Sequence, residues 1–168
     1  MPAFTYCPTC GSPLASDRAA PFADQKCFCC GSIHYHNSKP TAGALIFDGD
    51  RILLSKRAGE PFRGDWDIPG GFLEAGEDPR EGARREIREE TGLEIQVTGP
   101  PEVNVGRYGP TGDFVLNLYF RASIISGKPA PADDVEELRW FLMNELPTNL
   151  AWEHERQLLG RLAAEHHR

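Results

Sequence analysis

The stretch "GGFLEAGEDPREGARREIREETGL", Gly70 to Leu93, decides the fold and points to the chemistry. Asp78 followed by Pro79 is a typical helix start, because aspartate caps free amides and proline suits the first helical position. Gly92 is a typical helix stop. The pattern predicts a helix over about residues 79–91.

Acidic side chains gather on one side of this predicted helix. Glu86, Glu89 and Glu90 fall within a sector of about 100°, while Ala83 and Ile87 turn toward the core. Like charges at this spacing cost about 0.2–0.5 kcal/mol per pair. A divalent cation would reverse the sign of that cost, because Mg²⁺ or Mn²⁺ binds carboxylates and leaves other positions to water and phosphate oxygens.

The alternative is a solvated acidic face. Such a face normally interleaves lysines with the acids, and the sequence has none between Lys56 and Lys128. The pattern therefore favours a site for Mg²⁺ or Mn²⁺.

Nine positions of this stretch match the Nudix box, a motif of fixed spacing. They are Gly71, Glu77, Arg85, Glu86, Ile87, Glu89, Glu90, Gly92 and Leu93. The chain therefore resembles a Nudix hydrolase from about Thr41 onward, including "GDWDIPGG" before the helix and "EELRWF" after it. The resemblance implies an α+β fold, a Nudix-type α/β/α sandwich with a mixed sheet, and attack of water on a phosphorus of a nucleoside diphosphate derivative.

The resemblance also implies roles for the matching residues. The implied Mg²⁺ or Mn²⁺ ligands are box acids and one backbone carbonyl: Glu77, Glu86, Glu89, Glu90, and Gly71 or its neighbour Gly70. One of the acids would polarise the attacking water. Arg85 would orient a neighbouring glutamate by ion pairing.

In this family a further acid often reaches the site from a downstream loop. The segment "ADDVEELRW", residues 132–140, offers four candidates for a base or an extra ligand. We favour Glu136 and Glu137 over Asp133 and Asp134. A plain acidic turn before a strand is the alternative.

Aromatic side chains near predicted loops are candidates for stacking on a nucleobase. They are Phe62, Tyr108 and Phe114. Trp66 and Trp140 are expected to anchor the core instead.

Two Cys-x-x-Cys-Gly turns near the N-terminus predict a structural zinc site. Cys7, Cys10, Cys27 and Cys30 supply four thiolates at suitable spacing, whereas Cys29 has no place in that register. A segment of roughly 35 residues has too small a core to fold without such support. Disulfides or a redox dithiol are the alternatives, which the absence of a secretion pattern and the repetition of the motif disfavour.

The histidines are expected to ligate neither metal. His34 and His36 alternate on an extended segment and are interpreted as surface or packing residues. His154, His166 and His167 lie on or beyond the last predicted helix, where we expect them to be exposed.

A change of composition near Pro40 predicts two domains. All five cysteines lie at or before position 30. The first 40 residues carry three basic and two acidic side chains. Since the whole chain has a net charge of −7, the other 128 residues carry a net charge of about −8. We predict a zinc ribbon over residues 1–38 and a Nudix hydrolase domain over residues 39–168.

Alternating apolar residues predict the elements of the second domain. Strands are expected at 41–47, 51–57, 113–124 and 135–143, a terminal helix at 148–164, and loops at 99–101, 109–112 and 128–132.

Charge and hydropathy restrict the partners. A net charge of −7 argues against a nucleic-acid or membrane surface, and the longest apolar run, residues 42–47, is too short to cross a bilayer. Residues 1–7 lack the order of a signal peptide, so we expect a cytoplasmic protein. A homodimer is left open.

The substrate is expected to be a small nucleotide. The ribbon and box together resemble the NADH pyrophosphatase group, but "EIQVTGPPEVNVGRYGP", residues 94–110, stands where that group has a Ser-Gln-Pro-Trp-Pro-Phe-Pro tract. We therefore rank ADP-ribose slightly ahead of NADH. The alternatives are a zinc-ribbon adaptor or regulator with a ligand-sensing domain, and an RNA-cap hydrolase, which would need a basic groove.

Overall fold

The strand β3, Lys39–Asp48, organises the larger part of the fold. It pairs antiparallel with β4, Arg51–Arg57, and parallel with β8, Phe114–Ser126. The Asp48-Gly49-Asp50 turn joins β3 to β4, with Gly49 at φ 62°. The strands expected at 41–47 and 51–57 therefore form a hairpin.

Seven strands form the main sheet of the computed structural model, which describes residues 4–15, 23–110 and 112–166. The strand order is β5-β4-β3-β8-β7, with β6 paired to β3 and β9 paired to β4. The remaining strands are β5 (Trp66–Asp67), β6 (Gly70–Phe72), β7 (Glu94–Arg107) and β9 (Val135–Leu142). The sheet is mixed because β3 and β8 run parallel, whereas the other strand pairs described run antiparallel.

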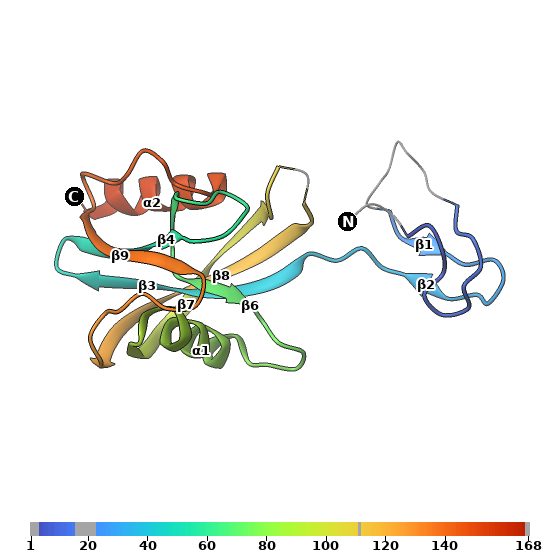
Figure 1. Cartoon of the computed structure of the whole chain (residues 1–168), viewed down its shortest axis with the longest axis horizontal. Helices are drawn as coiled ribbons and strands as arrows, with labels where there is room; N and C mark the ends of the chain where they lie inside the picture. Colours follow the sequence, from blue (N-terminus) through green and yellow to red (C-terminus); the bar gives the residue numbers. More distant parts are fainter. Residues whose placement is uncertain (1–3, 16–22, 111, 167–168) are drawn as a thin grey trace. The chain divides into compact units, whose positions relative to one another are not determined.

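One helix covers each face of this sheet (Figure 1). Helix α1, Pro79–Thr91, packs Ala83 and Ile87 on one face, and α2, Glu153–His166, packs Leu158 and Leu159 on the other. All four side chains are buried, so two separate cores hold the layers together. The predicted α/β/α sandwich is confirmed.

Two boundaries differ from the sequence-based expectation. Residues 99–101 lie inside β7 as a bulge, where the register against β8 shifts between Thr98 and Glu102, and not in a loop. Helix α2 begins at Glu153 and not near 148, because the preceding residues pair with β5. The Ala151 amide donates to the Trp66 carbonyl at 2.8 Å.

The chain divides into two units, Met1–Ser38 and Lys39–Arg168. In the first, β1 (Gln25–Lys26) pairs antiparallel with β2 (Ile33–His34). Each Cys-x-x-Cys turn is closed by a glycine amide, that of Gly11 or Gly31, donating to the carbonyl of the first cysteine.

Among the described residues, no helix is a candidate for crossing a membrane. Neither α1 nor α2 is long and apolar enough to span a bilayer.

Candidate active site

Helix α1 presents the box acids because both of its ends are capped. Asp78 accepts a hydrogen bond from the Arg80 amide at 2.8 Å. Gly92, at φ 68°, donates its amide to the Arg88 carbonyl at 3.0 Å. The observed bounds, Pro79–Thr91, match the predicted helix.

Glu90 is the most buried acid of the box, with only 7% of its surface exposed. Its Oε2 accepts a hydrogen bond from the Gly70 amide at 2.9 Å. Burial, followed by the charges of Asp67, Asp134 and Glu86, raises the pKa of Glu90 well above its ordinary value. The surroundings therefore disfavour an uncompensated negative charge at this position.

Gly71 lies directly against Glu86. A Cβ at Gly71 would stand 2.6 Å from the Glu86 carboxyl carbon, so with any other residue here the end of the Glu86 side chain would have to move. Burial raises the pKa of Glu86, and Arg85 opposes that shift. Strand β6 and helix α1 thus bring the Glu86 carboxylate close to the backbone of Gly71, which carries no side chain.

Arg85 binds three box glutamates at once. Its Nε and Nη2 donate to the two oxygens of Glu77 at 2.8 and 2.9 Å. Its Nη1 donates to Glu86 at 2.8 Å and to Glu89 at 3.0 Å. The bonds from Arg85, together with one from the Glu74 amide, lower the pKa of Glu77 to about 2. The guanidinium therefore holds the acids in fixed positions, as an orienting residue must.

A pocket of about 300 Å³ opens beside these acids. Among the described residues, the lining has one guanidinium, that of Arg57. Six carboxyl groups oppose it: Asp67, Glu86, Glu90, Asp133, Asp134 and Glu155. Glu89 and Glu77 do not belong to this lining.

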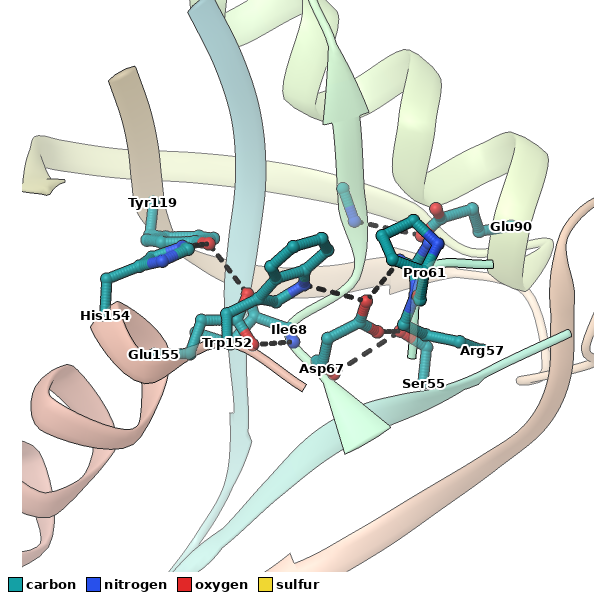
Figure 2. Close-up of polar contacts among 11 residues, drawn as sticks. Ser55, Arg57, Pro61, Asp67, Ile68, Glu90, Tyr119, Trp152, His154 and Glu155 are labelled. Atoms are coloured by element: carbon teal, nitrogen blue, oxygen red, sulfur yellow. Dashed lines mark hydrogen bonds and ion pairs between the residues drawn. The ribbon is translucent and has the colours of Figure 1, made fainter. Parts of the chain in front are cut away.

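Asp67 fixes Arg57 at one wall of the pocket (Figure 2). Its Oδ1 accepts from the Ser55 hydroxyl at 2.7 Å, and its Oδ2 accepts from Arg57 Nη1 at 2.8 Å and from the Trp152 indole at 3.4 Å. Arg57 Nε donates to the Pro61 carbonyl at 2.8 Å. Burial raises the pKa of Asp67 even beside this cation.

Glu155 connects α2 to the segment before β6 (Figure 2). Its Oε2 accepts from the Ile68 amide at 3.1 Å, and its Oε1 accepts from the Tyr119 hydroxyl at 2.7 Å. Burial raises the pKa of Glu155 well above its ordinary value, and the Asp67 charge adds to that rise.

His154 is buried, and the prediction that it is exposed is wrong. Its Nε2 lies 3.2 Å from the Tyr119 hydroxyl, and only 8% of its surface is exposed. Gly106 of β7 makes room, since a Cβ there would stand 2.2 Å from His154 Nδ1. Burial lowers the pKa of His154 to about 4. His166 ends α2, and His167 lies outside the described residues.

The downstream acids fall into two pairs. Asp133 and Asp134 precede β9 and line the pocket, whereas Glu136 and Glu137 do not line it. Glu136 accepts from Lys56 at 3.0 Å, and Glu137 accepts from Arg139 Nε at 2.9 Å. The structure therefore places Asp133 and Asp134 at the pocket, and not Glu136 and Glu137, which the sequence led us to favour.

Aromatic rings form one side of the pocket. Tyr108, 38% exposed, has its centroid 5.3 Å from that of Phe72 and 5.4 Å from that of Trp152. All three line the pocket. Phe62 instead packs edge-on against Trp152 at 5.1 Å, and Phe114 lies under the Arg107 guanidinium at 4.5 Å.

The donors at this site fit a hard divalent cation. Among the described residues, the lining offers carboxylates and the Gly70–Gly71 backbone and no thiolate, which is the ligand chemistry of Mg²⁺ or Mn²⁺. A cation would also offset the excess of acids over the single guanidinium. Glu86, Glu90 and the Gly70–Gly71 backbone are the groups placed to hold it.

Comparison with known proteins identifies the family. The family model described as "NUDIX domain" matches residues 37–161. The chain belongs to the NUDIX family. The nine-position motif lies within the matched residues.

Curated relatives of this NUDIX chain include two kinds of enzyme. The ADP-ribose pyrophosphatase of Methanocaldococcus jannaschii is 38% identical over 112 residues, covering 67% of this chain and 66% of the relative. The NAD-capped RNA hydrolase NudC of Stutzerimonas stutzeri is 32% identical over 146 residues, covering 84% of this chain and 49% of the relative. The chain thus spans about half the length of the NudC protein that it matches.

Solved structures show the same architecture. A NUDIX hydrolase from Nitrosomonas europaea superposes with a TM-score of 0.78 at 28% identity, covering 98% of this chain and 93% of that one. A UDP-X diphosphatase superposes with a TM-score of 0.65 at 26% identity, covering 80% of this chain and 66% of that one.

The N-terminal unit of the NUDIX chain carries a second candidate metal centre. The Sγ atoms of Cys7, Cys10, Cys27 and Cys30 all lie within 4.8 Å of one another, while Cys29 is exposed outside the cluster. Four converging thiolates are the ligand set of a zinc ribbon. His34 Nε2 lies 3.2 Å from Cys7 Sγ, so this histidine contacts the cluster from outside the four sulfurs.

Sequence reasoning did not find several residues that line the NUDIX pocket. They are Arg57, Asp67, Trp152, His154 and Glu155. Asp67 stands in the quoted "GDWDIPGG", and an acid between a strand signal and a Pro-Gly-Gly turn could have drawn attention to it. Glu155 carries no local signal, because its contacts with Tyr119 and Ile68 are distant in sequence.

Proposed function

We propose that this chain hydrolyses the diphosphate linkage of a small nucleoside diphosphate derivative such as ADP-ribose or NADH, releasing AMP as one product. The reaction would require Mg²⁺ or Mn²⁺. Water would attack one of the two phosphorus atoms, so a P–O bond forms to water while the bridging P–O bond breaks.

One observation carries the proposal. Glu86 and Glu90 face a pocket beside the Gly70–Gly71 backbone, and Glu90 is already bonded to the Gly70 amide. A bound divalent cation would neutralise charge on the diphosphate oxygens and lower the pKa of a coordinated water. Clustered, partly buried carboxylates cost stability unless a cation or hydrogen bonds compensate their charge.

The protein's own groups would bind and orient the two ends of the substrate. Arg57, the single guanidinium in the described lining, would meet a phosphate, and Asp67 and the Pro61 carbonyl keep it in position. The exposed ring of Tyr108 would stack on the nucleobase. Arg85 would hold Glu86 in the orientation that the reaction needs.

A proton acceptor for the attacking water would come from the box or from the loop before β9. Glu86, Glu90, Asp133 and Asp134 all line the pocket and could reach a bound water. A bound cation would oppose the rise in the pKa of Glu90 that burial and the neighbouring acids cause. We assign the water-activating role to the box acids, and keep Glu89 as a ligand that would turn in from its bond with Arg85.

ADP-ribose is the favoured substrate. The archaeal relative named an ADP-ribose pyrophosphatase matches two thirds of this chain. NADH and NAD-capped RNA contain the same adenosine diphosphate group, and the relatives named NAD-capped RNA hydrolase NudC support both as candidate substrates. A pocket of about 300 Å³ accommodates part of such a nucleotide.

A second candidate is hydrolysis of an NAD-type cap on RNA. The relatives named NAD-capped RNA hydrolase cover 84% of the chain. The net charge of −7 weighs against a long polyanion, which gains affinity from basic contacts along its backbone. We therefore treat capped RNA as a competing substrate in the test below.

The cysteine cluster completes the proposal. We assign one structural Zn²⁺ to the four thiolates, and a cytoplasmic location, where cysteines of this kind remain reduced.

A substrate panel tests the proposed function. ADP-ribose, NADH, diadenosine polyphosphates, nucleoside triphosphates and NAD-capped RNA would each be incubated with Mg²⁺ or Mn²⁺, with products identified by mass spectrometry. We expect AMP from ADP-ribose with the highest kcat/KM. A kcat/KM for capped RNA at least about tenfold above that for ADP-ribose would establish the second candidate. If the protein hydrolysed none of these compounds, the alternative of a zinc-ribbon adaptor with a ligand-sensing domain would be favoured.

A further inference from the structure

The segment that carries Gly70 and Gly71 into the site is held by hydrogen bonds from several different parts of the chain. The Trp66 amide donates to Asn149 at 3.0 Å, and the Pro69 carbonyl accepts from the Ala44 amide at 3.1 Å. Gly70 is bonded to Glu90 on α1. Between these contacts, the Ile68 amide donates to the Glu155 carboxyl at 3.1 Å. Glu155 is thus the side chain through which α2 reaches the segment.

Glu155 is buried, and both of its carboxyl oxygens accept hydrogen bonds. It is 1% exposed, a position that carboxyl groups occupy only when hydrogen bonds compensate their burial. Its second oxygen accepts from the Tyr119 hydroxyl at 2.7 Å, and that hydroxyl lies 3.2 Å from His154 Nε2. The carboxyl is therefore immobilised from the side opposite Ile68 (Figure 2).

The segment itself has no room to adjust. A Cβ at Gly70 would stand 2.4 Å from the Gly43 Cα, and a Cβ at Gly43 would stand 2.7 Å from the Pro69 carbonyl oxygen. In such close packing a small shift at Ile68 must be transmitted along the backbone to Gly70 and Gly71. Both glycines contact the acids of the site.

We propose that Glu155 is a positioning residue for the reaction: through the Ile68 amide it fixes the Gly70–Gly71 backbone against Glu90 and Glu86. This inference rests on the proposed hydrolysis for its kinetic consequences only. Glu155 does not need to touch the substrate, and Tyr119 is the group that holds Glu155 in place.

Two substitutions separate positioning from mere stability. Glu155→Gln keeps a carbonyl oxygen for the Ile68 amide and an NH₂ group that the Tyr119 oxygen can accept. Glu155→Met has similar length and removes both acceptors. The matched control is Glu165→Met, the same exchange at an exposed position of the same helix.

Hydrogen exchange of backbone amides gives a readout that is independent of activity. In Glu155→Met we expect the amides of Ile68 and Gly70 to exchange at least about tenfold faster, while amides in the middle of α1 keep their protection. Glu155→Gln and Glu165→Met should retain the wild-type protection at both positions. Faster exchange spread equally over the whole domain in Glu155→Met would overturn the proposal in favour of general destabilisation.

Kinetics with ADP-ribose supply the second readout. In Glu155→Met we expect kcat to fall about 10- to 100-fold, with KM changed less than about threefold. That range is typical of residues that orient metal ligands without binding the metal themselves. Glu155→Gln should recover most of kcat. A Glu155→Met variant with wild-type kcat and unchanged exchange at Gly70 would refute the proposal. Should the wild type hydrolyse no substrate, the proposed function fails, and the exchange data still decide whether Glu155 positions the segment.

Discussion

Glu90 of α1 and Gly70 of β6 are joined by a hydrogen bond of 2.9 Å from the glycine amide to the carboxylate. The bond ties the box helix to the strand that precedes it, so the acid and the glycine backbone approach the pocket as one unit. A buried carboxyl held by a single amide still has oxygen lone pairs available for a cation. The pair therefore defines the centre of the site.

Gly71→Ala should reduce activity without unfolding the protein. The added Cβ would stand 2.6 Å from the Glu86 carboxyl carbon, so the flexible end of that side chain has to move. A misplacement of about 1 Å can cost about 100-fold in rate, and we expect a loss of that order in kcat. Melting temperature should fall by less than about 3 °C, since no backbone is displaced.

Gly59→Ala is the matched control for that experiment. No heavy atom lies within 4 Å of the Cβ it would introduce, so activity and stability should both be preserved. Wild-type kcat in Gly71→Ala would show that Glu86 does not need its observed position.

The four clustered cysteines should hold one zinc ion per chain. Serine in place of Cys7, Cys10, Cys27 or Cys30 removes one thiolate and should lower the zinc content measured by inductively coupled plasma mass spectrometry. Cys29→Ser should keep the full content, since that thiol lies outside the cluster. Loss of zinc in Cys29→Ser combined with its retention in Cys30→Ser would contradict the assignment.

His154 should make stability rise with pH between about 4 and 6.5. Its pKa is lowered to about 4 in the fold from a usual 6.5, so the unfolded chain binds more protons in that window. The stability due to neutral His154 is fully present above 6.5 and is lost as pH falls toward 4. Its titratable neighbour Glu155, whose pKa is raised, gives a slope of opposite sign, and Tyr119 is protonated throughout.

The variant His154→Gln isolates the histidine contribution. Glutamine can keep a hydrogen bond with Tyr119 but does not titrate. We expect the drop in unfolding free energy between pH 7 and pH 5, measured by urea denaturation, to be smaller in the variant than in the wild type. An equal drop in both proteins would show that His154 does not contribute.

Local sequence signals account for α1 and its acids. Asp78, Pro79 and Gly92 determine where the helix begins and ends without help from distant residues, so its bounds were predictable. The position of Glu136 was not, because the side of a strand that a residue occupies depends on where pairing begins. Strand β9 starts at Val135 and directs Glu136 to Lys56.

Residues whose role depends on distant contacts escape a reading of the sequence. Trp152 reaches Asp67 across 85 positions, and His154 is buried because Gly106 of β7 leaves space for it. Nothing near residue 154 in the sequence reveals that space. The terminal helix was predictable from its leucines, but the burial of His154 and Glu155 at its first turn was not.

The central claim is that Glu90 and its neighbouring acids perform diphosphate hydrolysis. The most direct measurement is the rate of AMP release from ADP-ribose at saturating Mg²⁺ by Glu90→Gln, with Glu81→Gln, an exposed change on the same helix, as control. Glutamine keeps the acceptor for the Gly70 amide, so circular dichroism and melting should match the wild type. We expect kcat to fall by more than about 100-fold, beyond the range for outer contacts, while the control stays within about twofold. Turnover by Glu90→Gln within threefold of the wild type would contradict the claim.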